Sequence, residues 1–184
     1  MTAALTATAS EIVAEREGLD VLVNNAGITR DKTLKNMSEQ YWDELIAINL
    51  AAVTGLTEEA LALSLIPDGG RIINTSSISG IAGNFGQTNY TAAKAALIGY
   101  AAKRSEELEE RRITVNAIAP GYIETEMLNT IPMMTRIFAE RLTCLSQAGR
   151  PEDIAEAMTF LAYPACQAVN GQVLRVCGGN FLGA

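Results

Sequence analysis

The chain has 184 residues, enough for one domain with a sizeable core. Its 14 basic and 21 acidic residues give a net charge of −7, which repels phosphate backbones and argues against a nucleic-acid partner. The sequence contains no histidine, the usual general base of serine and cysteine hydrolases and the commonest metal ligand. Any acid–base chemistry must therefore come from other side chains, and no metal is implied.

The cysteine usage and the first residues favour a cytoplasmic protein. The three cysteines form no CxxC pair, so we expect Cys144, Cys166 and Cys177 to be buried apolar thiols in a reducing compartment. The opening segment has no basic leader and carries acidic residues, unlike a secretory signal. No apolar run approaches the roughly 20 residues that span a bilayer, so membrane insertion is not expected.

In the first third of the chain, a helix is followed by a strand and then by a longer helix. Residues 4–16 are predicted to form a helix, and the apolar run 19–24 a buried strand. Ser38 is a candidate N-cap for an amphipathic stretch that runs to about Leu65. Asn49 lies among apolar neighbours near the middle of that stretch, which calls for an explanation.

The rest of the chain continues the alternation. The predicted elements are a turn at 67–70, a strand at 71–77, a glycine-rich segment at 80–86, a helix containing Tyr90 and Lys94, a strand at 113–119, a helix from Pro151 to about Tyr163, and a strand at 172–176. Alternating strands and helices predict an α/β fold, in which helices cover both faces of a parallel sheet. Neither internal repeats nor linkers indicate a second domain.

Polar residues gather where the predicted strands end. Asn24 and Asn25 follow the first strand, Ser76 and Ser77 end the second, and the segment 120–125 follows the third. Ligands of open parallel sheets bind beyond the carboxyl ends of the strands. These positions therefore predict one site on one scaffold.

Tyr90 and Lys94 are four residues apart, so on a helix their side chains share one face. The pKa of tyrosine is normally near 10, and a neighbouring ammonium lowers it by favouring the phenolate. The same phenol can give its proton to a developing alkoxide when a carbonyl is reduced. On its own, the pair also fits a half-buried tyrosine and a lysine that reaches into solvent.

Ser77 precedes Tyr90 by thirteen residues, at the end of a predicted strand. Its hydroxyl could donate a hydrogen bond to a substrate carbonyl and stabilise the developing charge. As a nucleophile it would lack an activating imidazole, which makes a hydrolase the weaker interpretation.

The chain resembles the short-chain dehydrogenase/reductase family, and within it the 3-oxoacyl-[acyl-carrier-protein] reductases. The resemblance is carried by "LVNNAGITRDK", "AINL", "SSISGIAGNFGQTNYTAAKAALIGY", "ITVNAIAPGYIETEM" and "GRPEDIAEAMTFLA", in the family's order and spacing. It implies a Rossmann-like, doubly wound parallel sheet in a three-layer α/β/α arrangement.

The family's functional residues transfer to matching positions of this chain. The resemblance implies that Tyr90 is the proton donor, that Lys94 lowers the pKa of Tyr90 and binds the nicotinamide ribose, that Ser77 orients the carbonyl, and that Asn49 holds a water of the proton relay. It assigns cofactor contacts to Asn25, Ala26, Gly27, Tyr90, Lys94, Pro120, Gly121, Ile123 and Thr125. The alternatives are ordinary turn chemistry at the loop positions and, for Asn49, an amide satisfied by local backbone.

One part of the family pattern has no counterpart here. The family begins with a strand and a TGxxxGxG loop that holds the cofactor pyrophosphate. Gly80, Gly83 and Gly86 lie between the serine and tyrosine motifs, so they do not supply that loop. We expect residues 1–184 to be a single, N-terminally truncated catalytic domain that lacks the first strands of the family fold, with the strand 19–24 at an open edge. A mis-assigned start codon at Met1 would explain this beginning.

The resemblance implies NADPH-dependent reduction of a 3-oxoacyl thioester, carried by acyl carrier protein or CoA, in fatty acid biosynthesis. NAD is not excluded as the cofactor, and a homotetramer or homodimer is expected. Two alternatives stay open. The chain could be a non-catalytic fragment or assembly partner of a complete reductase, or a short-chain dehydrogenase for another secondary alcohol.

Overall fold

Four parallel strands form the centre of the computed structural model, which describes residues 18–125 and 139–180. The strands are β1 (Val21–Asn24), β2 (Arg71–Thr75), β3 (Thr114–Pro120) and β4 (Val173–Val176), hydrogen-bonded in the order β1-β2-β3-β4. Their carboxyl ends therefore meet at one edge of the sheet. The predicted helix at 4–16, as well as Phe181 and Leu182, lies outside the described residues.

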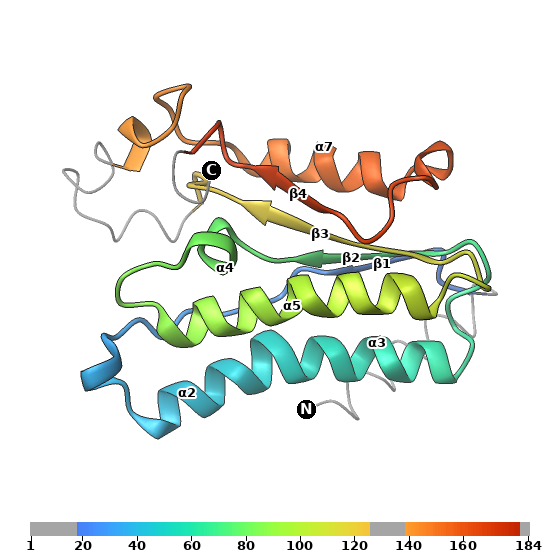
Figure 1. The fold of residues 1–184 in the computed structure, drawn as a ribbon, viewed down its shortest axis with the longest axis horizontal. Helices are drawn as coiled ribbons and strands as arrows, with labels where there is room; N and C mark the ends of the chain where they lie inside the picture. The colour runs from blue at the N-terminus through green and yellow to red at the C-terminus, as the bar shows by residue number, and fades with distance from the viewer. Residues whose placement is uncertain (1–17, 126–138, 181–184) are drawn as a thin grey trace.

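One face of the sheet is covered by α2 (Glu39–Ile46), α3 (Ala52–Ala62) and α5 (Thr88–Glu107), as Figure 1 shows. Ser38 caps α2, as the sequence predicts, because its hydroxyl accepts a hydrogen bond of 3.2 Å from the Tyr41 amide. Between α2 and α3 the helix widens into one π-helical segment, η2 (Ala47–Ala51), which sequence periodicity does not predict. Leu61, Ile72 and Val115 belong to the core on this face.

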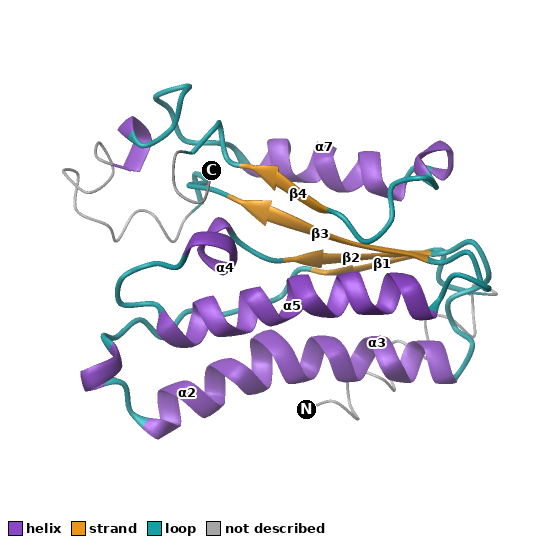
Figure 2. Ribbon diagram, viewed as in Figure 1, coloured by secondary structure: helices purple, strands orange, loops and turns teal. Residues whose placement is uncertain are grey.

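The opposite face is covered by α7 (Pro151–Ala162), which Figure 2 shows across the sheet from α5. Ile73, Ile118 and Leu161 are at most 2% exposed there, and Ile154 and Met158 of α7 pack against them. The side chains of neighbouring residues in β2 thus point to opposite faces, Ile72 toward α3 and α5 and Ile73 toward α7. The predicted three-layer α/β/α arrangement with a doubly wound parallel sheet is confirmed.

The described structure also contains the short helices η1 (Leu34–Asn36), α4 (Ile78–Ala82) and η4 (Pro164–Cys166). The second strand ends two residues earlier than predicted, at Thr75. The reason is that Ser77 caps α4, with its hydroxyl accepting a hydrogen bond of 3.1 Å from the Ser79 amide.

Within the described residues, β1 lies at an edge of the sheet, since β2 is its one described partner. The side chain of Val23 is 40% exposed. This agrees with the expectation that the strand at 19–24 is an edge strand.

The continuous helix Glu39–Ala62 is long and apolar enough to cross a membrane by length and composition alone, which for a single helix is weak evidence of a membrane span. Core helices of soluble proteins share this property. This helix buries one face, with Leu45, Asn49 and Leu61 at most 9% exposed. About a third of the apolar stretch is buried, so the core accounts for part of its apolar residues.

Candidate active site

The carboxyl ends of β1, β2 and β3 point toward α4 and the first turn of α5 (Figure 1). Side chains from all these elements could therefore contribute to one site, as the positions of the polar residues predict. Asn24, the last residue of β1, is buried and donates hydrogen bonds to Asn74 of β2 at 2.8 Å and to Thr57 of α3 at 3.0 Å. This buried network fixes the ends of the two strands relative to the helix layer.

Tyr90 and Lys94 lie on the same side of α5. The Lys94 Nζ is 5.6 Å from the centre of the Tyr90 ring, and the Lys94 residue is only 4% exposed. Ser77, the residue that caps α4, lies close enough to the Tyr90 hydroxyl for its side chain to oppose the rise in the Tyr90 pKa. The structure therefore brings together the three residues that the sequence placed in one reactive cluster.

Thr75 connects this cluster to the end of β1. Its backbone carbonyl accepts a hydrogen bond of 2.7 Å from the Lys94 Nζ, and its hydroxyl donates one of 3.0 Å to the Asn25 side chain. A further bond of 2.7 Å, from the Ser76 hydroxyl to the Lys94 carbonyl, ties the end of β2 to α5. Sequence reasoning missed Thr75, although its place as the last residue before two serines at a strand end was the available signal.

Burial controls the protonation of the cluster. It lowers the pKa of Lys94 to about 8, so the ammonium is still charged at neutral pH. It also raises the pKa of Tyr90, an effect that the Ser77 side chain opposes and that the negative charge of Asp31 reinforces. The expected lowering of the Tyr90 pKa is thus absent from this geometry, because desolvation of the phenolate dominates.

Asn49 is fully buried, and its side chain pairs with the backbone of Ile28. Its Oδ1 accepts a hydrogen bond of 2.8 Å from the Ile28 amide, and its Nδ2 donates one of 2.9 Å to the Ile28 carbonyl. Both ends of the amide are therefore used by the segment that follows β1. The amide is satisfied by backbone, but this backbone lies 21 residues away along the chain and is not the local backbone of the alternative interpretation. A role in a proton relay stays a prediction.

Asn25, Ala26 and Gly27 form the exposed segment between β1 and Ile28. A Cβ at Gly27 would lie 3.3 Å from the Asn49 Oδ1, so this segment passes close to η2. The pairing of Asn49 with Ile28 therefore positions the predicted ribose-binding turn.

The end of β3 is held close to β4. A Cβ at Gly121 would lie 2.7 Å from the Cys177 Cα, which explains why glycine follows Pro120 here. Tyr122 accepts a backbone hydrogen bond from Gly149 at 2.9 Å, and Glu124 donates one to Gly149 at 2.8 Å. In such a parallel bridge the amide and carbonyl of the middle residue, Ile123, point away from the partner.

Thr125 is the last described residue before the gap and is exposed.

The glycine-rich segment has a structural explanation. A Cβ at Gly80 would lie 2.8 Å from the Lys94 carbonyl carbon, so glycine lets α4 pack directly on the backbone of α5. Gly83 and Gly86 have φ values of 79° and 80°, which side-chain-bearing residues rarely adopt. These glycines therefore shape the connection into α5.

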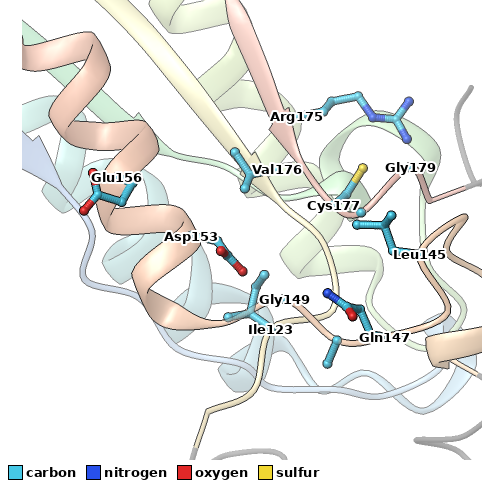
Figure 3. A pocket seen from close by; sticks show the side chains of 12 residues that line it. Ile123, Leu145, Gln147, Gly149, Asp153, Glu156, Arg175, Val176, Cys177 and Gly179 are labelled. Carbon is cyan, nitrogen blue, oxygen red and sulfur yellow. The ribbon is translucent and has the colours of Figure 1, made fainter.

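A cavity of about 480 Å³ lies at the ends of β3 and β4, beside the start of α7 (Figure 3). Asp153, Arg175 and Cys177 are among its lining residues. Of the predicted site residues, Ile123 alone lines it, whereas Tyr90, Lys94, Ser77 and Asn49 do not. No residue of the tyrosine cluster therefore lines this cavity.

The expectation of three buried thiols is wrong. Cys144 is exposed, and Cys166 and Cys177 are half-buried, and all three are free thiols. Cys144 pairs through its backbone amide with Gly179 at 3.2 Å, on the surface segment before α7.

The donor set at the strand ends fits a nicotinamide dinucleotide. An ammonium has three donors, and Thr75 takes one from Lys94, which leaves two for ribose hydroxyls. Thr75 links the Asn25 side chain to that ammonium, because it forms hydrogen bonds with both. The backbone of Ile123 offers a donor and an acceptor for a carboxamide. The residues present therefore suit the nicotinamide half of such a cofactor.

Comparison with known proteins gives one family over nearly the whole chain. The family model described as "Enoyl-(Acyl carrier protein) reductase" matches residues 1–180. A 3-oxoacyl-[acyl-carrier-protein] reductase FabG of Thermotoga maritima is 44% identical over 170 residues, 92% of this chain and 69% of that protein. The protein of the same name in Vibrio cholerae is 40% identical over 93% of this chain and 70% of its own length.

A third relative has a different name. Nodulation protein G of Azospirillum brasilense is 41% identical, over 94% of this chain and 70% of its own length. These matches agree with the parallel sheet and the serine, tyrosine and lysine cluster at its carboxyl edge. The chain belongs to the short-chain dehydrogenase/reductase family of NAD(P)-dependent oxidoreductases that act on CH–OH groups.

Proposed function

We propose that the chain reduces a 3-oxoacyl thioester to the 3-hydroxyacyl thioester with NADPH, as a step of fatty acid biosynthesis. The observation that carries the proposal is the cluster of Ser77, Tyr90 and Lys94 at the carboxyl end of β2. The names of the 3-oxoacyl-[acyl-carrier-protein] reductases among the relatives support the substrate class.

In this proposal Tyr90 donates the proton that the substrate oxygen acquires. Burial raises the pKa of Tyr90, so the phenol carries its proton at neutral pH, which suits a donor. The Ser77 side chain, which interacts with Tyr90, donates a hydrogen bond to the same carbonyl oxygen. Two hydroxyls would then stabilise the developing negative charge.

Lys94 acts beside the phenol in two ways. Its ammonium stays charged at neutral pH even though burial lowers its pKa to about 8, so it favours negative charge forming on the tyrosine oxygen after proton transfer. The bond from its Nζ to the Thr75 carbonyl at 2.7 Å fixes the ammonium at the end of β2. From there its other donors would hold ribose hydroxyls.

The nucleotide would lie across the ends of β1, β2 and β3. Asn25, Ala26 and Gly27 would border the adenosine ribose, and the segment from Pro120 to Thr125 the nicotinamide. When bound, NADPH supplies the hydride for the carbonyl carbon. Asn49 supports this arrangement by holding Ile28, and we propose that it also orders a water that resupplies protons to Lys94.

We propose further that residues 1–184 act as a single catalytic domain, that copies of the chain assemble as a homotetramer or homodimer, and that the protein works in the cytoplasm. The acyl group would be carried by acyl carrier protein or CoA. Oxidation or reduction of another secondary alcohol is the second candidate, because the relative named nodulation protein G shows that similar chains do not all carry the reductase name.

The decisive experiment pairs cofactor binding with turnover. NADPH and NADH are titrated against the protein by nucleotide fluorescence, and initial rates are then measured with acetoacetyl-CoA, with an acetoacetyl carrier-protein thioester and with simple ketones. We expect NADPH binding and a preference for the thioesters. Binding without thioester reduction, but with turnover of another ketone, would transfer the assignment to the second candidate, and no binding of either nucleotide would refute both.

A further inference from the structure

Tyr90 lies in the first turn of α5, at the end of a helix that lacks the usual cap. The first amides of an α-helix have no carbonyl partner within the helix, and helix ends fray unless other groups accept from them. Gln87 occupies the N-cap position of α5, and its side chain makes no capping hydrogen bond. The turn that carries the candidate proton donor therefore needs another support.

Asn89 supplies an acceptor from inside that turn. It is fully buried, and its Oδ1 accepts a hydrogen bond of 2.8 Å from the Tyr90 amide. Asparagine is a poor residue for the body of a helix, because its side chain competes with the helical backbone for hydrogen bonds. Its place in the second position of a buried helix end therefore calls for an explanation.

The other end of the same amide ties the turn to two segments that are distant along the chain. The Asn89 Nδ2 donates hydrogen bonds to the Arg30 carbonyl at 3.2 Å, in the segment after β1, and to the Tyr41 carbonyl at 3.3 Å, in α2. Both amide hydrogens and the acceptor oxygen are used, so the side chain has one orientation. One buried amide thus joins three segments directly beside Tyr90.

The segments that this amide joins are also tied to one another. The Arg30 guanidinium, after β1, donates to the Glu44 carboxylate of α2 at 2.8 Å and 2.9 Å. The Gln87 Nε2 donates a hydrogen bond of 2.8 Å to the Asp31 carboxylate, and Gln87 forms an isolated parallel bridge with Lys32. The start of α5 is therefore anchored to segments that are cross-linked to each other.

We infer that Asn89 is a positioning residue, which holds the Tyr90 phenol in place for proton transfer by fixing the first turn of α5 against α2 and the segment after β1. Proton transfer needs the donor within hydrogen-bond reach of the acceptor, and a misplacement of about 1 Å can cost about 10²-fold in rate. Lys94 lies one turn further into the helix and has its own bond to Thr75, so fraying would displace the phenol from the ammonium. The role in proton transfer rests on the proposed function, whereas the effect on the turn does not.

The test compares two buried asparagines in the full chain. Asn116 is 1% exposed, and its side chain joins β3 to the segment before β4, with Nδ2 donating to the Val169 carbonyl at 2.8 Å and Oδ1 accepting from the Gln172 amide at 3.0 Å. Asn89→Leu and Asn116→Leu keep the branched shape of the side chain and remove its hydrogen bonds. Asn89→Ser is a milder variant that leaves room for water at the two carbonyls, and it carries the test if Asn89→Leu does not fold.

Three quantities are measured: urea unfolding, the kcat of acetoacetyl-CoA reduction with the affinity for NADPH, and hydrogen exchange of the Tyr90 amide by NMR. We expect kcat to fall by about 10- to 100-fold in Asn89→Leu and by less in Asn89→Ser, with the affinity for NADPH much less affected. The Tyr90 amide should exchange about two- to tenfold faster in both, the factor for the loss of one hydrogen bond. Asn116→Leu should lose stability but keep kcat and the Tyr90 exchange rate well below its melting temperature.

A merely structural Asn89 would lose stability as Asn116 does, without a specific loss of kcat. Wild-type kcat in every folded Asn89 variant overturns the inference, and so does an equal loss of kcat in Asn116→Leu at equal stability. Unchanged exchange of the Tyr90 amide in the Asn89 variants overturns it as well. If the wild type reduced no thioester but the Tyr90 exchange still rose in the Asn89 variants alone, the proposed function would fail while the role of Asn89 in holding the turn would stand.

Discussion

The two ends of the sheet's carboxyl edge differ in how their polar groups are held. At the β1 and β2 end, Lys94 and Asn49 are at most 4% exposed, and each is tied by hydrogen bonds to backbone of another segment. At the β3 and β4 end lies the cavity of about 480 Å³ (Figure 3), where Glu156 and Asp153 are exposed. Cavity size alone would have selected the second region. The buried, hydrogen-bonded donors and shifted pKa values at the β1 and β2 end identify that end as the candidate active site, because preorganised groups contribute most to stabilising a transition state.

Tyr90→Phe tests this contrast with the largest expected effect. The change removes one hydroxyl, and loss of a general acid typically lowers the rate by about 10²- to 10⁴-fold. We expect a loss of that order in the initial rate of acetoacetyl-CoA reduction, with NADPH binding retained.

Tyr163→Phe, at an exposed position after α7, is the matched control and should keep the rate. Wild-type turnover in Tyr90→Phe would show that the proton comes from elsewhere.

The burial of Lys94 predicts a pH-dependent stability. The pKa of Lys94 is about 8 in the folded chain, against roughly 10.4 for an unfolded lysine. Between these values the unfolded state binds more protons, so the free energy of unfolding should rise with pH from about 8 to 10. Relative to Lys94→Met, the wild type should gain at most about 3 kcal/mol over that interval.

Urea unfolding at several pH values measures this gain. The interval stops near pH 10, because the raised pKa of Tyr90 makes stability fall with pH above it. Lys103→Met, on an exposed part of the same helix, controls for the loss of one positive charge. A constant difference between the wild type and Lys94→Met would mean that the ammonium is not desolvated as described.

Gly80→Ala tests the packing under Lys94. The added Cβ would lie 2.8 Å from the Lys94 carbonyl carbon and 2.9 Å from the Ala95 nitrogen, so α4 must move away from α5. We expect a loss of about 1–3 kcal/mol in the free energy of unfolding. The cluster should also lose activity, since Ser77 caps the displaced helix.

Gly99→Ala makes the same substitution later in α5, where a Cβ would have no neighbour within 4 Å. Because alanine is the better helix former, it should stabilise the protein by up to about 1 kcal/mol. Equal effects of the two changes would contradict the close approach at Gly80.

Much of this architecture could be predicted from local patterns in the sequence. The strands at β1 and β3 are short apolar runs, and Ser38 stands directly before its helix, so periodicity and capping suffice. The spacing of Tyr90 and Lys94 predicted their shared face because helix geometry alone determines it. The place of Ser77 at a predicted strand end made it a candidate, and the family resemblance added the role of Asn49.

What the sequence does not give are contacts between distant segments. The pairing of Asn49 with Ile28 and the contact of Gln87 with Asp31 join segments at least 21 residues apart. The π-helical turn at Asn49 departs from regular helix geometry. The direction of the Tyr90 pKa shift also depends on burial, which no spacing in the sequence encodes. Prediction therefore succeeded for elements and failed for the environment of their side chains.

Asp153→Ala should have the smallest effect and complete the contrast between the two ends. Asp153 lines the cavity, and its carboxylate accepts a hydrogen bond of 2.7 Å from the Arg150 amide at the start of α7. Loss of this N-terminal bond should cost about 1 kcal/mol in the free energy of unfolding. Asp153 has no contact with the tyrosine cluster in the described residues, so acetoacetyl-CoA reduction should stay within about twofold of the wild-type rate when measured well below the melting temperature. A large loss of turnover in a folded Asp153→Ala protein would mean that the cavity takes part in substrate binding, and the two ends of the sheet would then form one site.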